Sequence, residues 1–256
     1  MSKKGIHVLN KESVNKARSL YYGLFSKLFV FTPKTDRYAG VLEAIEVMIA
    51  HPIDENSHEA LNEIKQFILE VGELAFIQEY DDIFHNPAYK VVRNTASYYN
   101  EGVESGHMRV AVIDFLAKTR IRKDEVQFKE NEDSVGFIFT FMHELVELVV
   151  AGGKEYESVS HCMFTEVINP FIDEFIINVY EHKMARVYKS IAIVLNAFMA
   201  FERMYFEVAK PPLKKQERTQ KPVEPISQAE ARRRAENKAK KAAGESVPHS
   251  IERTQR

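Results

Sequence analysis

Several His and carboxylate residues have spacings that could bind a metal. Glu-x-x-His places two ligands on one helix face, as helical di-iron proteins do, and it occurs at Glu55 to His58 and at Glu104 to His107. Both copies lie in polar stretches at the start of expected elements, so neither projects from an apolar stripe into a core. Nine His among many Glu make two such matches unremarkable. The sequence predicts no metal site and no cofactor.

Other chemical motifs are incomplete. His143 begins a segment similar to the zincin motif His-Glu-x-x-His, but Glu147 stands where the second His ligand is needed. Cys162 is the only cysteine, so a small buried thiol is the better interpretation. Gly152-Gly153 follows an expected helix, which suits a C-terminal cap rather than a phosphate loop. We therefore expect a binding protein and not an enzyme.

The elements that position these residues are predicted to be helices. Apolar residues recur at spacings of three and four, and no convincing strict alternation is present. These apolar stripes span residues 14–28, 41–49, 61–74 (running toward Tyr80), 110–117, 135–149, 164–179 and 191–205. Asn10 is the expected N-cap of the first stripe, which ends before Pro33. The second stripe ends before Pro52 and the last before Pro211-Pro212. Residues 86–106 form the longest irregular piece. The fold class is predicted as all-α, a single globular bundle of seven to nine helices.

Charge divides the chain. Residues 211–256 hold twelve basic and six acidic residues, and none of the 28 Phe and Tyr, whereas the preceding 210 residues carry a net charge of −8. We predict a flexible N-terminus (1–7), an all-helical domain (8–209) and a disordered basic tail (210–256), in which 229–243 could form a transient helix. The absence of an 18-residue apolar run or a secretory signal favours a cytoplasmic protein.

The order of segments resembles the TorD/DmsD/NarJ family of redox-enzyme maturation chaperones, from Arg18 to Glu207. The matching segments are Arg18-x-x-Tyr21-Tyr22-x-x-Phe25-x-x-Leu28-Phe29, Tyr80-Asp81-Asp82-Ile83-Phe84, Ser97-Tyr98-Tyr99-x-x-Gly102, Glu130-Asn131-Glu132-Asp133-Ser134 before Phe141-Met142-x-x-Leu145, and His161-x-x-Phe164 with Phe171, Phe175, Tyr188 and Phe206. The fourth is similar to the family's E-P-x-D-H hinge, with Asn131 and Ser134 in place of Pro and His. Two further differences concern this chain as a whole. It has no tryptophan, whereas tryptophans are common in the family, and it has an additional basic tail.

The resemblance implies a non-enzymatic cytoplasmic chaperone. It would bind the twin-arginine signal peptide, the immature catalytic subunit of a molybdenum or tungsten pterin oxidoreductase, or both, and support cofactor insertion before export. We expect a formate dehydrogenase or a dimethyl-sulfoxide-reductase relative as the client. We expect no nucleic acid partner and no stable membrane insertion, and the chain is expected to be a monomer or a dimer.

A receptor for such a peptide needs carboxylates for two guanidinium groups beside an apolar groove. The resemblance points to Glu130 and Asp133 for the carboxylates, together with Ser134. The expected groove residues are aromatic: Tyr22, Phe84, Tyr98 and Tyr99.

Each assignment has an alternative. Asp133 or Ser134 could be the N-cap of the following helix, and Tyr22 and Phe84 could be core residues. Only one of Tyr98 and Tyr99 would face a groove if their segment is extended. For the whole chain, the alternatives are a helical metal- or nucleotide-binding enzyme and a scaffold that acts through its basic tail.

Overall fold

The computed structural model describes residues 10–32, 37–126 and 128–212. These contain α1 (Lys11–Phe29), α2 (Val41–Ala50), α3 (Glu55–Val71), α4 (Glu73–Phe84), α5 (Ala96–Glu101), α6 (His107–Ala117), α7 (Val135–Val150), α8 (Glu155–Met163), the π-helix η1 (Phe164–Ile168), α9 (Ile172–Tyr180) and α10 (Val187–Phe206). The described residues form no strand, only an isolated bridge between Thr95 and Ser134. The predicted all-α class is confirmed. No helix in these ranges is long and apolar enough to cross a bilayer.

The predicted terminal segments mostly lie outside this part of the chain. The flexible N-terminus (1–7), residues 213–256 of the predicted tail and the helix suggested at 229–243 all belong to the residues that the structure does not describe. The domain boundaries at 8 and 209 therefore stay predictions.

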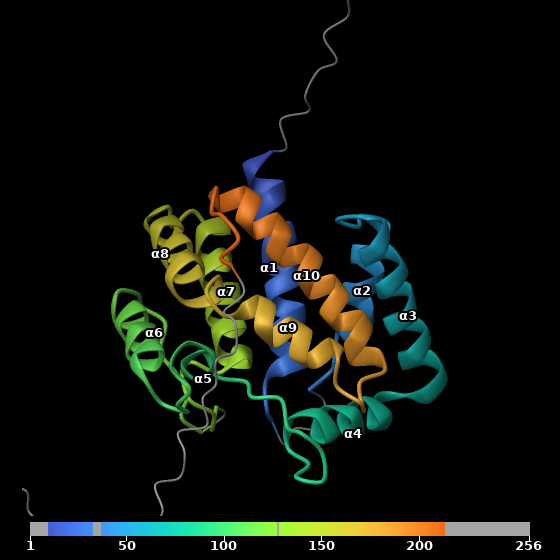
Figure 1. The fold of residues 1–256 in the computed structure, drawn as a ribbon. Coiled ribbons are helices and arrows are strands. Elements are labelled where there is room, and N and C mark those ends of the chain that lie inside the picture. The colour runs from blue at the N-terminus through green and yellow to red at the C-terminus, as the bar shows by residue number, and fades with distance from the viewer. Residues whose placement is uncertain (1–9, 33–36, 127, 213–256) are drawn as a thin grey trace, which may run out of the picture. The chain divides into compact units, whose positions relative to one another are not determined.

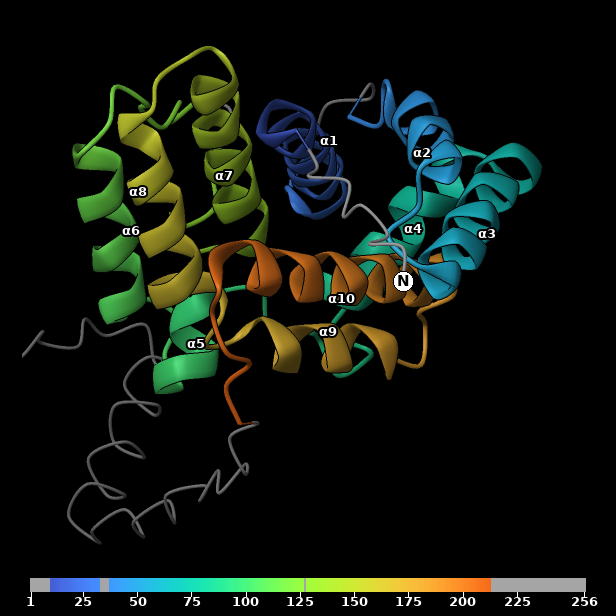
Figure 2. The ribbon, with the colours of Figure 1, turned by 90° about the horizontal axis from the view of Figure 1, so that it is seen from above.

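Helix α1 lies at the centre of the bundle. Helices α7, α8 and α6 follow one another on one side of it, α2 and α3 lie on the other side, and α10 crosses these layers with α9 packed against it (Figures 1 and 2). The most extensive helix–helix contact is between α1 and α7, and the next is between α3 and α10. The first and last long helices of the described chain thus both pack in the middle of the fold.

Small residues let α1 and α7 approach closely. A Cβ atom added at Gly136, in the first turn of α7, would lie 2.6–2.7 Å from backbone atoms of Phe29 and Val30 at the end of α1. Further along the same contact, Ser26 Oγ lies 2.6 Å from Thr140 Oγ1. A side chain at Gly136 would therefore force two backbones apart.

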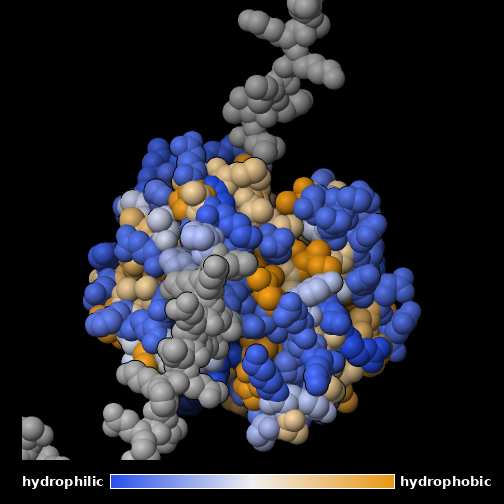
Figure 3. All heavy atoms as spheres, in the orientation of Figure 1, coloured by the Kyte–Doolittle hydropathy of each residue, from blue (hydrophilic) through white to orange (hydrophobic). Residues whose placement is uncertain are grey.

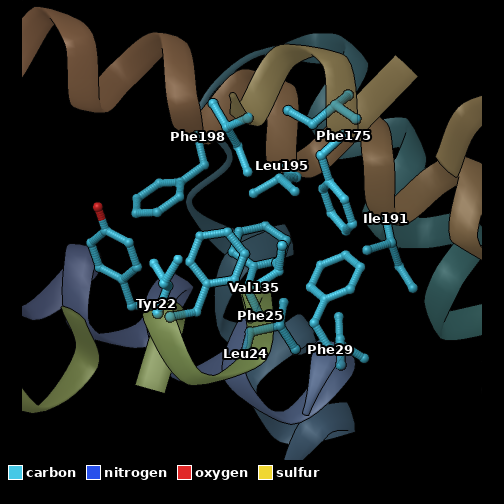
Figure 4. Close-up of a cluster of buried hydrophobic side chains, with 14 of the residues drawn as sticks. Tyr22, Leu24, Phe25, Phe29, Val135, Phe175, Ile191, Leu195 and Phe198 are labelled. Atoms are coloured by element: carbon cyan, nitrogen blue, oxygen red, sulfur yellow. The ribbon is translucent and has the colours of Figure 1, made fainter. Parts of the chain in front are cut away.

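The core is rich in aromatic rings. Helix α1 contributes Phe25 and Phe29, which pack against Phe198 of α10 and Phe175 of α9, with centroid distances of 5.8 Å for Phe25–Phe198 and 5.3 Å for Phe29–Phe175 (Figure 4). All four side chains are buried. Tilted and edge-to-face rings at these separations are the favoured aromatic geometries.

A charged pair lies inside this apolar core. Arg18 of α1 donates from Nε and Nη2 to the two carboxylate oxygens of Glu202 in α10, at 2.6 and 2.8 Å, and both side chains are almost wholly buried. Tyr22 Oη also donates to Glu202 (2.6 Å), and the guanidinium stacks on the rings of Tyr205 and Phe206. Burial alone would lower the pKa of Arg18, but the adjacent carboxylate outweighs it and raises that pKa. The Glu202 carboxylate therefore accepts three hydrogen bonds inside the core, two from Arg18 and one from Tyr22.

Four predictions about the helices needed correction. The stripe at 61–74 is interrupted because Gly72, at φ 84°, ends α3 and begins α4. The irregular stretch 86–106 contains α5. The stripe at 164–179 is two elements, because the π-helix η1 ends at Ile168, two residues before Pro170, and α9 starts at Ile172. The described residues hold ten α-helices, so the prediction of seven to nine was too low.

Candidate functional site

The predicted carboxylates lie in a loop before α7, residues 128–134, which we call the hinge loop. It pairs with the segment before α5: Ala96 N donates to Asp133 O (2.9 Å), and Val135 N donates to Asn94 O (2.7 Å). The bridge between Thr95 and Ser134 lies between these two bonds. The hinge loop thus fastens the start of α5 to the start of α7.

Glu130 of the hinge loop is half-buried and lies next to the C-terminal end of α1. Its Oε1 accepts a hydrogen bond from Asn94 Nδ2 (2.7 Å), and its Oε2 accepts one from Phe31 N (3.1 Å). Burial raises the pKa of Glu130, although these hydrogen bonds oppose the shift. Phe31, which makes the second of these bonds through its backbone, is 38% exposed. Glu130 is therefore hydrogen-bonded to the backbone of a residue whose side chain is partly exposed.

Glu132 has the strongest ionic contacts of the hinge loop. Arg109 Nε and Lys123 Nζ donate to its two oxygens at 2.5 and 2.9 Å. Burial opposes ionisation, but these two hydrogen bonds prevail and lower the pKa of Glu132 to about 2. We assigned this residue no role from the sequence, although its position among three acidic residues was visible there. Its ion pair with Arg109 links the hinge loop to α6.

Asp133 and Ser134 are both buried in the hinge loop. Asp133 Oδ2 accepts a hydrogen bond from Ser97 N (3.0 Å), whereas Oδ1 has no partner, and burial raises the pKa of this side chain. Ser134 is the N-cap of α7, and its Oγ accepts a hydrogen bond from Phe137 N (3.3 Å). Of the two capping candidates, Ser134 is the correct one. Neither side chain is presented to a ligand at the surface in this arrangement.

Three of the four predicted aromatic residues are core residues. Tyr22 is wholly buried and hydrogen-bonded to Glu202, and Phe84 packs on Phe29. Tyr99 is buried against Phe171. Tyr98 alone is half-buried, and it lies with Tyr99 on the short helix α5 rather than on an extended segment.

The structure brings together only part of the predicted site. Glu130, Asp133 and Ser134 share the hinge loop, and α5 with its two tyrosines follows the segment paired to it. Tyr22 instead belongs to the core network that joins α1 and α10. The groove that the four aromatic residues Tyr22, Phe84, Tyr98 and Tyr99 were expected to line is therefore not formed by them jointly.

The chemical motifs considered first are dispersed. In the first Glu-x-x-His match, Glu55 is exposed and His58 is partly exposed, with 3.9 Å between His58 Nδ1 and Glu55 Oε1. Within the described ranges, no three His, Cys, Asp or Glu side chains gather in a way that could hold a metal ion. His143 and Glu147 both contact Ser19 across the contact between α1 and α7, and His143 Nδ1 lies 3.0 Å from the Ser19 carbonyl oxygen.

A pocket of about 460 Å³ lies between α3, α9 and α10. Carboxylates line it from two sides, at Glu59 and Glu63 of α3 and at Glu181 after α9, and apolar side chains lie between them. None of the seven predicted site residues lines this pocket. The spacing of Glu59 and Glu63 around Ala60 placed these residues on one helix face, but the sequence did not show which helices would oppose that face.

Comparison with known families decides the affiliation of the chain. The family model described as the nitrate reductase delta subunit matches residues 50–176, a range that contains the hinge loop and most of the elements from α3 to the start of α9. The chain belongs to this family. Its members are chaperones of the NarJ/TorD type, which act in the maturation of redox enzymes.

A solved structure and a search of curated proteins complete the comparison. The crystal structure of a candidate redox enzyme maturation protein from Archaeoglobus fulgidus is similar to this NarJ/TorD-type chain with a TM-score of 0.45 and 18% sequence identity, over 78% of this chain and 99% of that one. No curated protein matches the chain.

Proposed function

We propose that this protein is a cytoplasmic chaperone that binds the twin-arginine signal peptide of a molybdenum or tungsten pterin oxidoreductase. By the same proposal it holds the immature catalytic subunit until the cofactor is inserted. Membership of the NarJ/TorD-type family is the observation that carries this proposal. A formate dehydrogenase or a relative of dimethyl-sulfoxide reductase is the proposed client.

The chemistry of the hinge loop supports an arginine-binding role for Glu130 in particular. A guanidinium group donates in a fork that matches a carboxylate, whereas an ammonium group is a point charge. The Glu130 carboxylate accepts hydrogen bonds from two neutral donors, the backbone N–H of Phe31 and the side-chain amide of Asn94. Lys123 Nζ donates to the backbone carbonyl of Glu130 (2.8 Å) and acts on its carboxylate through charge. Exposed Phe31 beside it offers an apolar contact to the residues that follow the arginines.

Calorimetry with the full chain tests this proposal. A synthetic twin-arginine signal peptide should bind, and the same peptide with both arginines replaced by lysine should bind at least about ten-fold more weakly, because lysine cannot form the bidentate contact. Glu130→Gln should weaken binding of the arginine peptide by about 1.5–3 kcal/mol, the range for one hydrogen bond to a charged group.

The matched control is Glu125→Gln, because Glu125 is 75% exposed and its ion pair with Lys123 is long, at 3.4 Å. This change should leave the affinity unaltered. Equal binding of the arginine and lysine peptides by the unaltered chain would contradict the proposed function. An unchanged affinity in the Glu130 variant alone would remove that residue from the site.

A further inference from the structure

The pocket between α3, α9 and α10, which we call the α3–α9–α10 groove, has an apolar floor and partly exposed apolar walls. Ala60 and Ala192 are buried at its base, and Ile177 and Tyr180 are 37% and 48% exposed at its edge. Figure 3 shows hydrophobic side chains at the centre of the face on which α9 and α10 lie, with hydrophilic side chains around them. Partly exposed large apolar side chains that line a hollow are typical of an interaction surface.

The rim of this groove carries charge of one sign. Its charged side chains are Glu59, Glu63 and Glu181, and no Lys or Arg is among the residues that line it. All three are exposed. Glu63 accepts a hydrogen bond from Ser190 Oγ (2.6 Å), which orients its carboxylate without neutralising it. In contrast, Glu132 of the hinge loop is already paired with two cations.

These features select one kind of occupant. A purely apolar segment would leave three carboxylates to be desolvated without partners, which is unfavourable. An acidic segment would be repelled. A segment that joins basic side chains to an apolar stretch would satisfy both the rim and the floor, with the fork of an arginine suited to a carboxylate. A volume of about 460 Å³ holds a few side chains of such a segment.

We infer that the α3–α9–α10 groove is a docking surface for an apolar peptide segment that carries arginine. The inference rests on the proposed function, because the twin-arginine signal peptide is the segment with this chemistry. The groove receives the start of the apolar stretch on Ile177 and Tyr180, and its rim carboxylates accept hydrogen bonds from a guanidinium group. Glu130 of the hinge loop, together with Phe31 after α1, supplies a smaller contact.

Hydrogen exchange of the full chain with and without the twin-arginine signal peptide locates the contact directly. The inference expects slower amide exchange in residues 56–63 and 176–181 when the peptide is present. Protection confined to residues 94–98 and 128–134 would overturn the groove and leave the proposed function intact. If the peptide does not bind the unaltered chain at all, the proposed function fails and the inference fails with it.

Substitution of the rim gives a second measurement. The triple variant Glu59→Gln, Glu63→Gln, Glu181→Gln should bind the peptide about ten- to one-hundred-fold more weakly than the unaltered chain. The matched control removes three exposed carboxylates elsewhere, with Glu70→Gln, Glu144→Gln and Glu166→Gln, and should lower the affinity by less than about three-fold. Equal losses in the two triple variants would mean that only net charge matters, and that result overturns the groove.

The apolar part of the groove has its own test. Tyr180→Ala removes an exposed ring from the edge and leaves the buried floor unchanged, so the variant should fold as before. Peptide affinity should fall about five- to twenty-fold, and the melting temperature should stay within about two degrees of the unaltered chain. An unaltered affinity in this variant, with the fold intact, would contradict a contact on Tyr180.

Discussion

At the scale of single residues, three carboxyl groups within one loop have different environments. Burial raises the pKa of Glu130 and of Asp133, whereas Arg109 and Lys123 lower that of Glu132 to about 2 despite its burial. The sequence shows three acidic residues within four positions, but it does not show which has a raised and which a lowered pKa. The cations that make this difference come from α6 and from residue 123. In the proposed function, Glu132 therefore contributes to stability and Glu130 to peptide binding.

Glu132→Gln should lower the free energy of unfolding by about 2–3 kcal/mol at pH 7, because it leaves two cations without their carboxylate. A pKa of about 2 in the folded protein against an ordinary value near 4.5 means that this stabilisation is complete above about pH 4.5 and is lost as the pH falls toward 2. Urea titrations from pH 7 to pH 2 should show the two proteins converging at the acid end. A constant difference over that range would contradict the ion pairs as its source.

At the scale of elements, the contact between α1 and α7 depends on small side chains. Two positions differ in what a methyl group would meet. At Gly136 it would meet the backbone of Phe29 and Val30, whereas at Gly23 it would meet the ring of His143 at 3.1 Å. A ring can turn aside, but two packed backbones cannot separate without loss of contact along both helices.

Gly136→Ala should therefore destabilise the protein by about 2–3 kcal/mol, although alanine favours a helix by about 1 kcal/mol. Gly23→Ala should change the stability by less than about 1 kcal/mol, because the gain in helix propensity offsets a small shift of His143. Thermal unfolding of both variants by circular dichroism makes the comparison. Similar losses in the two variants would show that the close approach at Gly136 has no special cost.

The helices themselves were largely predictable, and their contacts were not. The N-cap at Asn10 and the end of α2 before Pro52 follow from local sequence signals, and the structure has both. For α7 the sequence offered Asp133 or Ser134 as the N-cap, and the structure has Ser134. The interruption at Gly72 was missed because the apolar stripe continues through it. For the site, the buried positions of Tyr22 and Asp133 depend on Glu202 and on Ser97, partners that local patterns do not identify.

At the scale of the whole molecule, charge is the feature that the sequence predicts most directly. Residues 1–210 carry a net charge of −8. Three of these acidic residues line a groove without a basic side chain, so the attraction for a basic segment has a long-range part and a local part. The long-range part is screened by salt, whereas contacts with apolar side chains are not.

Affinity for the twin-arginine signal peptide should fall about ten-fold or more as the salt concentration rises from 20 to 300 mM (roughly from a 20 Å to a 6 Å screening length), mainly through slower association. Stopped-flow or surface-plasmon measurements over this range provide the rates. The lysine peptide, which has the same charge, is the control for purely electrostatic attraction and should show a similar slope. A salt-independent association rate would mean that the acidic surface does not contribute to capture.

The buried pair of Arg18 and Glu202 limits how the first and last long helices can be aligned. Its two parallel hydrogen bonds are formed in one alignment only, with Tyr22 completing the set. If α1 slid by one turn, a guanidinium ion would be left among phenyl rings without a counter-ion, at a cost comparable to the net stability of a small domain. The pair therefore specifies the axial alignment of α1 against α10 and disfavours misaligned packing of the bundle, whatever it adds to the stability of the correct packing.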